Sequence, residues 1–167
     1  MRQKVSESEA KHPTHGLDAI DRRILKALVE DGRMSTLDVA EKVGLSATPC
    51  SRRIRQLEDR GVIEGYAAKI NPAALGLSLC VMVSVRLGKH GPDAHEQFSK
   101  AIRDRPEITE CLLVTGNTDY LLRVWVKDID ALREFMTNGL QGIPTVAETS
   151  TMLVLNQTVY PPTGLRG

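Results

Sequence analysis

The chain has 167 residues, of which 41% are hydrophobic and 26% charged, and its formal net charge is +1. These values are ordinary for a soluble globular protein, and the length suits one large domain or two small ones. The near-neutral charge excludes a surface that is basic overall, so a nucleic-acid partner would need a local basic surface.

The chain begins with a polar segment. Residues 1–16 contain no apolar core, which predicts a disordered arm rather than a signal peptide. The best candidate for a membrane span, Leu77–Leu87, is interrupted by polar residues. Cys50, Cys80 and Cys111 are widely spaced and form no CxxC pair, which indicates reduced thiols. We therefore expect a cytoplasmic protein that does not contact a membrane.

Two short helices are expected next. Residues 17–30 are amphipathic, and Asp18 and Asp21 at their start form a carboxylate variant of the capping box. Residues 36–43 form a second helix, which Ser35 can cap and which a glycine in the left-handed conformation can end. A tight turn then leads into a third helix.

The third helix is the most informative part of the chain. It begins at Ser46 and ends before Gly61, and it carries three arginines and no acidic residue from Ser46 to Leu57. Exposed arginines on a short helix are often only a solvated surface. The preceding helix, the glycine turn and the absence of acidic residues together favour a DNA-reading helix of the helix-turn-helix type.

A step of about 100° per residue sorts this helix into faces. Cys50 and its apolar neighbours face the core, whereas Thr48, Arg52 and Arg55 lie close to the opposite direction. Arg52 and Arg55 are candidates for reading guanine edges, and Arg53 projects nearer the core, toward a phosphate or an internal acidic residue. The predicted DNA-contact residues are Ser46, Thr48, Ser51, Arg52, Arg53, Arg55 and Gln56.

Two short segments complete the first half. Val62–Ile70 has apolar runs around Glu64-Gly65, which predict a small hairpin or wing. Residues 71–76, with the sequence NPAALG, are typical of a linker. We therefore expect a DNA-binding domain over residues 17–70.

The second half has the pattern of a small α/β domain. Leu77–Leu87 alternates strictly between apolar and mixed residues, as a strand with one core face does. Further expected elements are a helix over 93–105, strands over 108–114 and 120–126, a helix after Asp128 and a strand over 149–159.

The resulting order is β-α-β-β-α-β, that of ferredoxin-like domains. The predicted fold class is α+β: a winged helix-turn-helix domain, a linker, and a βαββαβ domain over residues 77–160. Residues 161–167 are expected to form a tail.

Several motifs resemble those of the Lrp/AsnC transcription regulators, also called feast/famine regulatory proteins. They are LDAIDRRIL, GLSATPCSRRIRQLEDRGVIEGY, the NP of the linker and VTGNTDYLLRVWV, and the resemblance runs from Leu17 to about Val159. The LSATPCSRR segment is similar to that of leucine-responsive members. The resemblance implies that Asn71-Pro72 opens the connector to an effector domain.

The same resemblance implies how the protein works. Members are cytosolic, bind double-stranded DNA at pseudo-palindromic operators and dimerise through the βαββαβ domain. Dimers assemble into tetramers or octamers, and amino acids tune assembly or DNA binding. The mixed second face of Leu77–Leu87 fits a sheet used as a dimer surface.

The segment VTGNTDY is the candidate effector site. Glycine, asparagine and aspartate form turns for backbone reasons alone, and this is the alternative to a binding role. The chemistry nevertheless fits a free amino acid, since Asp119 can hold its ammonium and the nearby backbone amides its carboxylate. The resemblance implies an effector pocket at this loop, with leucine as the first candidate. The predicted effector contacts are Gly116, Asn117, Thr118, Asp119, Tyr120, Thr149 and Thr151.

Three other functions are compatible with parts of the sequence. An enzyme or metal site is disfavoured, because His90 and His95 have no cysteine partner nearby and no nucleophile–base set stands out; no cofactor beyond the effector is expected. An RNA-binding domain of the same strand order would stack bases on aromatic residues, and here only Tyr120 and Trp125 lie in strands. An amino-acid-sensing oligomer without specific DNA binding is opposed only by the arginine helix.

Overall fold

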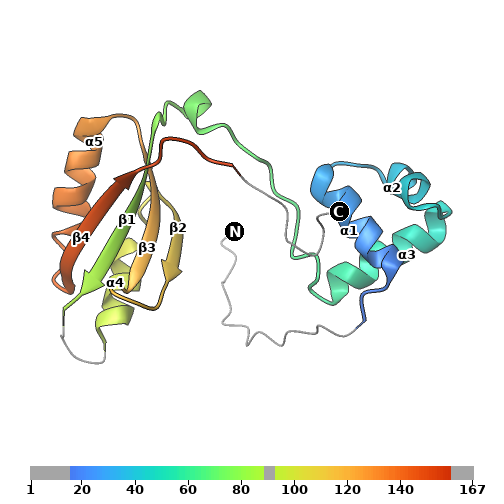
Figure 1. Cartoon of the computed structure of the whole chain (residues 1–167), viewed down its shortest axis with the longest axis horizontal. Helices are drawn as coiled ribbons and strands as arrows, with labels where there is room; N and C mark the ends of the chain where they lie inside the picture. Colours follow the sequence, from blue (N-terminus) through green and yellow to red (C-terminus); the bar gives the residue numbers. More distant parts are fainter. Residues whose placement is uncertain (1–15, 89–92, 159–167) are drawn as a thin grey trace. The chain divides into compact units, whose positions relative to one another are not determined.

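The computed structural model describes residues 16–88 and 93–158 (Figure 1). The expected arm before Gly16, the expected tail and the histidine at position 90 lie outside these residues. The chain divides into two compact units between Ala68 and Lys69.

The N-terminal unit is a bundle of three helices, α1 (Ala19–Glu30), α2 (Thr36–Val43) and α3 (Ala47–Asp59). The capping box at the start of α1 is confirmed, because Asp18 and Asp21 each accept the other's backbone N–H. Gly44 has φ 71°, the left-handed conformation that ends α2. The buried core of the unit consists of Ile24, Ala27, Val39, Ala40, Val43, Cys50 and Leu57.

The expected hairpin between residues 62 and 70 is not formed. No residue between 62 and 70 belongs to a strand. The backbone N–H groups of Val62 and Ile63 instead donate to the Leu57 carbonyl, at 2.9 and 3.1 Å, and both side chains pack on the three-helix core. This packing uses the apolar residues that the first strand of a hairpin would need. The chain beyond is exposed, and Tyr66 donates its hydroxyl to Glu58 at 3.0 Å.

The C-terminal unit confirms the βαββαβ order. After the 3₁₀ turn η1 (Pro72–Leu75), its elements are β1 (Leu79–Leu87), α4 (Ala94–Ile102), β2 (Ile108–Leu113), β3 (Tyr120–Val126), α5 (Ile129–Glu134) and β4 (Val146–Leu153). The four strands form one antiparallel sheet in the order β2-β3-β1-β4. The helix after Asp128 continues beyond α5 as a π-helix, η2 (Phe135–Leu140).

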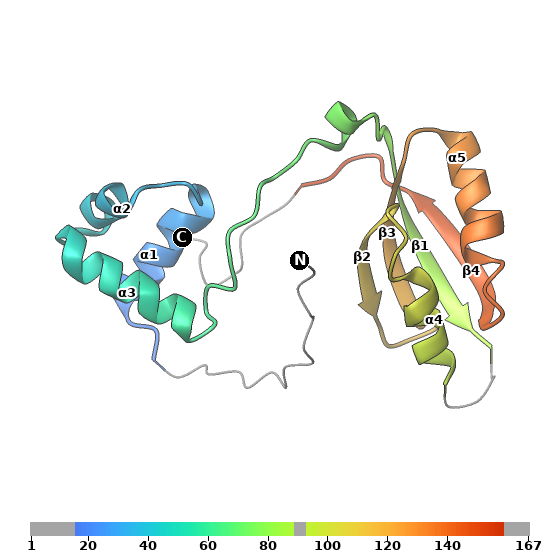
Figure 2. The same cartoon turned by 180° about the vertical axis from the view of Figure 1, so that it is seen from behind.

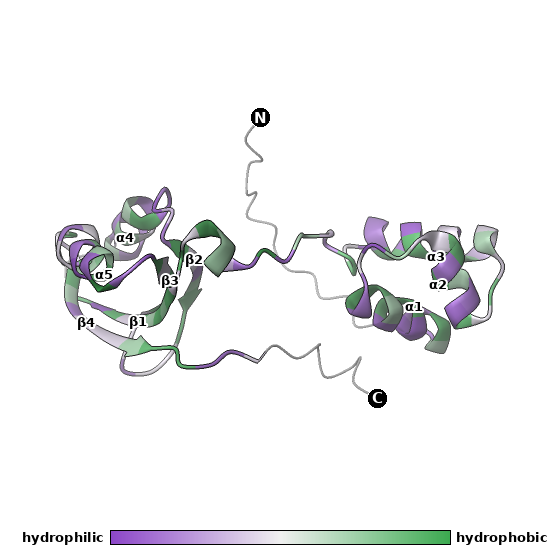
Figure 3. Cartoon of the chain, turned by 90° about the horizontal axis from the view of Figure 1, so that it is seen from above, coloured by the Kyte–Doolittle hydropathy of each residue, from purple (hydrophilic) through white to green (hydrophobic). Residues whose placement is uncertain are grey.

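One face of this sheet carries the core. Figure 3 shows α4 and α5 on the same side of the strands, and Figure 2 views the sheet from that side. Val81, Val83 and Val85 of β1 point to this side and are buried with Phe98 and Leu140. The alternate residues of β1 belong to the opposite face, which neither helix covers (Figure 3).

The last strand lies earlier in the chain than expected, at Val146–Leu153 rather than 149–159. Its limits follow from its partner β1, because Leu87 pairs with Val146 and Val81 with Leu153. One further backbone contact follows, because the Val154 N–H donates to the Cys80 carbonyl at 3.0 Å. None of the helices in the described part of the chain combines the length and apolarity that a membrane crossing requires.

Candidate DNA-binding surface and effector loop

Helix α3 presents an exposed polar face. Its core side holds Cys50, Ile54 and Leu57 as expected, and burial raises the pKa of the Cys50 thiol. Six of the predicted contact residues are exposed on the other sides: Ser46, Thr48, Ser51, Arg52, Arg55 and Gln56. Ser46 occupies the N-cap position, but its side chain makes no capping hydrogen bond. The first turn of α3 contains no acidic residue, so its N–H groups and positive dipole end suit a phosphate.

Four of these residues line one shallow concavity of about 460 Å³. Thr48, Ser51, Arg52 and Arg55 form its α3 side, and Thr36 at the start of α2 forms the other. Sequence reasoning missed Thr36, although its place as the first residue of the preceding helix was a usable signal. Two helices of a helix-turn-helix unit that share a polar concavity can contact one DNA backbone and one groove together.

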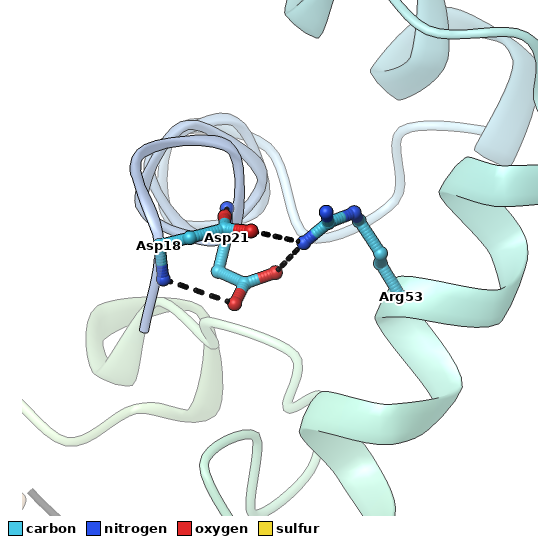
Figure 4. Close-up of polar contacts among 3 residues, drawn as sticks. All are labelled: Asp18, Asp21 and Arg53. Atoms are coloured by element: carbon cyan, nitrogen blue, oxygen red, sulfur yellow. Dashed lines mark hydrogen bonds and ion pairs between the residues drawn. The ribbon is translucent and has the colours of Figure 1, made fainter. Parts of the chain in front are cut away.

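Arg53 is the exception among the predicted DNA contacts. Its Nη1 donates to Asp18 Oδ2 at 2.6 Å and to Asp21 Oδ1 at 2.8 Å (Figure 4). Asp21 is buried, and the Arg53 side chain is 29% exposed. The Arg53 side chain therefore links α3 to the start of α1. Of the two partners expected for it, a phosphate or an internal acidic residue, the structure shows the acidic residue, and Arg53 is removed from the predicted DNA contacts.

We expect the Arg53→Met variant to melt at a lower temperature than the wild type. The substitution leaves the Asp21 carboxylate buried without its cationic partner, and an unpaired buried charge is destabilising. Because no phosphate contact is lost, the slope of log K against log salt should stay unchanged, whereas losing a phosphate-binding cation lowers it by about 1. Thermal unfolding measures the melting temperature, and DNA titration at several salt concentrations measures the slope. A reduced slope in the variant would show that Arg53 contacts DNA.

The same cluster predicts a pH dependence. The Asp21 backbone N–H, and then the Arg53 guanidinium, hold the pKa of Asp18 below its usual value of 3.8. A carboxylate with a lowered folded-state pKa stabilises the fold above its unfolded pKa, and this stability is lost as pH falls through the folded value. We expect Asp18→Asn to flatten the acid limb of the stability curve below about pH 4, in melting scans from pH 7 to pH 2.

The loop between β2 and β3 is tied to the end of β1. Thr118 Oγ1 donates to the Val85 carbonyl at 2.8 Å, and Asp119 Oδ2 accepts the Leu87 N–H at 2.7 Å. Gly116 has φ 122°, a conformation that side-chain-bearing residues rarely adopt. Gly116 and Asn117 are exposed, whereas Thr118 and Asp119 are half-buried. One oxygen of Asp119 thus holds the loop against the end of β1, and among the described residues the other accepts no hydrogen bond.

Two of the remaining predicted effector residues, Tyr120 and Thr149, lie on the same row of the sheet. Val85 pairs with Tyr120 on one side and with Thr149 on the other. Tyr120 does not face outward as a ligand contact would: it is buried against Phe98, and its hydroxyl lies 3.1 Å from His95 Nδ1. Tyr120 is therefore a core residue that anchors the loop.

The two predicted threonines of β4 turn toward the helical layer. Thr149 Oγ1 lies 3.5 Å from Gln141 Nε2, and Thr151 Oγ1 lies 3.7 Å from Met136 Sδ. The structure therefore brings Thr149 to the same end of the sheet as the loop and places Thr151 one step further along the strand. Among the described residues, no group of three or more His, Cys, Asp or Glu side chains could hold a metal ion.

Two family models match the chain, one for each unit. A winged helix-turn-helix DNA-binding domain matches residues 17–64, and an Lrp/AsnC ligand binding domain matches residues 80–163. The leucine-responsive regulatory proteins of Escherichia coli (strain K12) and Klebsiella pneumoniae are each 44% identical to this chain over 147 residues. These alignments cover 88% of this chain and 90% of each relative.

Two solved structures of regulators are similar to this chain over most of its length. A transcriptional regulator from Neisseria meningitidis in complex with L-methionine superposes with a TM-score of 0.83 at 36% identity, covering 90% of this chain and 97% of that one. A feast or famine regulatory protein from M. tuberculosis complexed with L-methionine has a TM-score of 0.76 at 32% identity, covering 89% and 97%. The likeness thus extends over both units of the chain.

Proposed function

The chain belongs to the Lrp/AsnC family of transcriptional regulators, and on this basis we propose that it binds its operator as a homo-oligomer and responds to an apolar amino acid. The observation that carries the DNA half of the proposal is the exposed face of α3. Arg52 and Arg55 stand there beside Thr48 and Ser51, with no acidic residue in the first turn. Arg52 and Arg55 read guanine edges, and the serine and threonine hydroxyls position the helix on phosphates.

The effector is a free amino acid held at the loop between β2 and β3. The unused oxygen of Asp119 accepts the ammonium group, and the exposed backbone around Gly116 and Asn117 receives the carboxylate. Two structurally similar regulators were solved with L-methionine, and the two relatives above are named for their leucine response. Leucine and methionine are therefore the first candidates.

The second face of the sheet supplies the dimer surface. Met82 and Leu121 are half-buried there, and Leu112 and Met152 are 42% and 51% exposed. These apolar side chains lie in neighbouring register positions across all four strands. The ion pair Arg123–Glu110 continues the row of Met82 and Met152, and the ion pair Arg86–Glu148 lies beyond Ser84 on the same face, so charged groups accompany the apolar ones. A second copy of the chain, packing the same face, completes the operator-binding unit in the cytoplasm.

The amino acid regulates DNA binding because effector binding and oligomer assembly are thermodynamically linked. The effector loop is bonded to the end of β1, a strand that also forms the dimer face, so both features share one rigid element. A ligand shifts assembly only by binding one assembly state more tightly than another. An amino acid that binds one oligomeric state more tightly therefore changes how many pairs of α3 helices contact the DNA at the same time.

We expect L-leucine or L-methionine to raise the melting temperature of the full chain. A ligand at 100 times its dissociation constant, binding only the folded state, adds about 2.7 kcal/mol of stability. Asp119→Asn should remove this response, since its amide oxygen can still accept the Leu87 N–H but its charge is lost. Asp130→Asn, an exposed carboxylate on α5, is the matched control. A screen of the common amino acids that changes neither stability, oligomeric state nor DNA affinity would contradict the amino-acid response.

A further inference from the structure

The chain leaves the DNA-binding unit past a tyrosine that is held by α3. Val62 and Ile63 pack on the three-helix core directly after that helix. Further along, Tyr66 donates its hydroxyl to Glu58 Oε1 at 3.0 Å. Glu58 lies in the last turn of α3, so this hydrogen bond joins the predicted DNA-reading helix to the start of the linker.

The ring of Tyr66 also lies beside the end of α1. A Cβ at Gly32, just beyond that helix, would stand 3.8 Å from the ring carbon Cδ1 of Tyr66, an ordinary contact distance. Tyr66 thus contacts the ends of two helices of the same unit. Partial burial, and then the hydrogen bond to Glu58, raise the pKa of the Tyr66 hydroxyl above its usual value of 10.0, so this group stays protonated and donates at neutral pH.

The position of Glu58 is unfavourable for α3 itself. The C-terminal end of a helix carries a partial negative charge, which favours cations in the last turn. The last turn of α3 contains no basic residue and holds the carboxylates of Glu58 and Asp59. Glu58 therefore does not stabilise the helix by its charge, and the contact that the structure shows for its side chain is the one with Tyr66.

We propose that Tyr66 is a positioning residue that determines where the linker leaves the DNA-binding unit and, through this, which spacing of operator half-sites the protein accepts. The inference rests on the operator-binding homo-oligomer proposed above. When Tyr66 is held on α3, the segment between the anchored residue and η1 is 67–71, and without this contact it is 64–71, because Ile63 is then the anchor.

The longer segment changes the reach of each chain. Residues 67–70 are exposed and belong to no helix or strand, so they can extend. Three further extended residues add about 10 Å, which corresponds to about three base pairs along DNA. A chain without the Tyr66 contact should therefore tolerate half-sites that the wild type does not.

The test measures affinity for operators whose half-sites are moved apart. An operator selected by the full-length wild type is varied by inserting one to five base pairs between its half-sites. Tyr66→Phe keeps the ring and removes the donor, and Glu58→Ala removes the acceptor. At the native spacing we expect each variant to bind about twofold more weakly, because a longer tether lowers the effective concentration of the second helix. The loss caused by a three-base-pair insertion should be at least about threefold smaller in the variants than in the wild type.

Two further proteins complete the design. Asp59→Ala removes the same charge from the same turn of α3 and should keep the wild-type dependence on spacing. The double variant of Tyr66→Phe and Glu58→Ala should behave like either single variant, because both changes remove one interaction.

The dependence on spacing distinguishes positioning from a merely structural role. A variant that is only less stable would lose affinity equally at every spacing, and such parallel losses would overturn the inference while operator binding stands. A wild type that binds its operator equally well at all spacings would also refute the inference, although specific DNA binding would remain. If the wild type selects no operator, the proposed function itself fails.

Discussion

Replacing both Arg52 and Arg55 with alanine is expected to abolish sequence-specific DNA binding while leaving the fold intact. Both side chains are exposed on α3 and line the concavity shared with α2. Each bidentate contact to guanine is worth about 1–3 kcal/mol, so the pair accounts for about 2–6 kcal/mol per half-site. That range corresponds to a loss of about 30-fold to about 10⁴-fold in half-site affinity.

The measurement begins with an operator selected from random-sequence duplexes by the wild-type chain. Affinities of the wild type and the double variant are then compared for that operator and for an unrelated duplex at fixed salt. Lys100→Ala with Arg103→Ala removes the same charge from exposed positions at the end of α4 and serves as control. Amino-acid binding and sedimentation should be unchanged in both variants. Equal losses on the operator and on unrelated DNA would mean that the arginines contact only phosphates.

The faces of α3 could be predicted because a helix has a fixed angular step. Cys50 and Leu57 proved to be buried, and Arg52 and Arg55 proved to be exposed. The same angular step places Arg53 near the buried side of the helix, but it does not decide whether its partner is a phosphate or an internal acidic residue. The structure identifies that partner as Asp18 and Asp21, which lie 35 and 32 residues away in sequence. Local periodicity carries no information about such long-range partners.

The features that the sequence did not reveal depend on how side chains pack against elements distant in sequence. Val62 and Ile63 have the apolar character of a strand, yet packing on the helical core keeps them out of one. Tyr120 was expected at the effector because it adjoins the loop, but strand alternation turns its ring inward against Phe98.

A charge at Met82 is expected to break the dimer that we propose and, with it, operator binding. Met82 lies at the centre of the uncovered sheet face, paired with Arg123 on β3 and Met152 on β4. In the separate chain Met82→Asp places a half-exposed carboxylate beside Arg123, which the fold should tolerate. Between two packed sheets, two symmetry-related carboxylates would be buried near each other, which strongly disfavours association.

The consequence for DNA binding is large because a dimer contacts two half-sites. Specific regulators bind with dissociation constants of about 10⁻⁸–10⁻¹¹ M, and a monomer keeps only about half of that binding free energy. We therefore expect Met82→Asp to sediment as a monomer and to lose about 10³-fold or more in operator affinity. Met82→Leu preserves the apolar face and should keep both properties. A Met82→Asp protein that stays dimeric would place the dimer interface elsewhere, whereas a monomer with full operator affinity would show that pairing of the helices is not required.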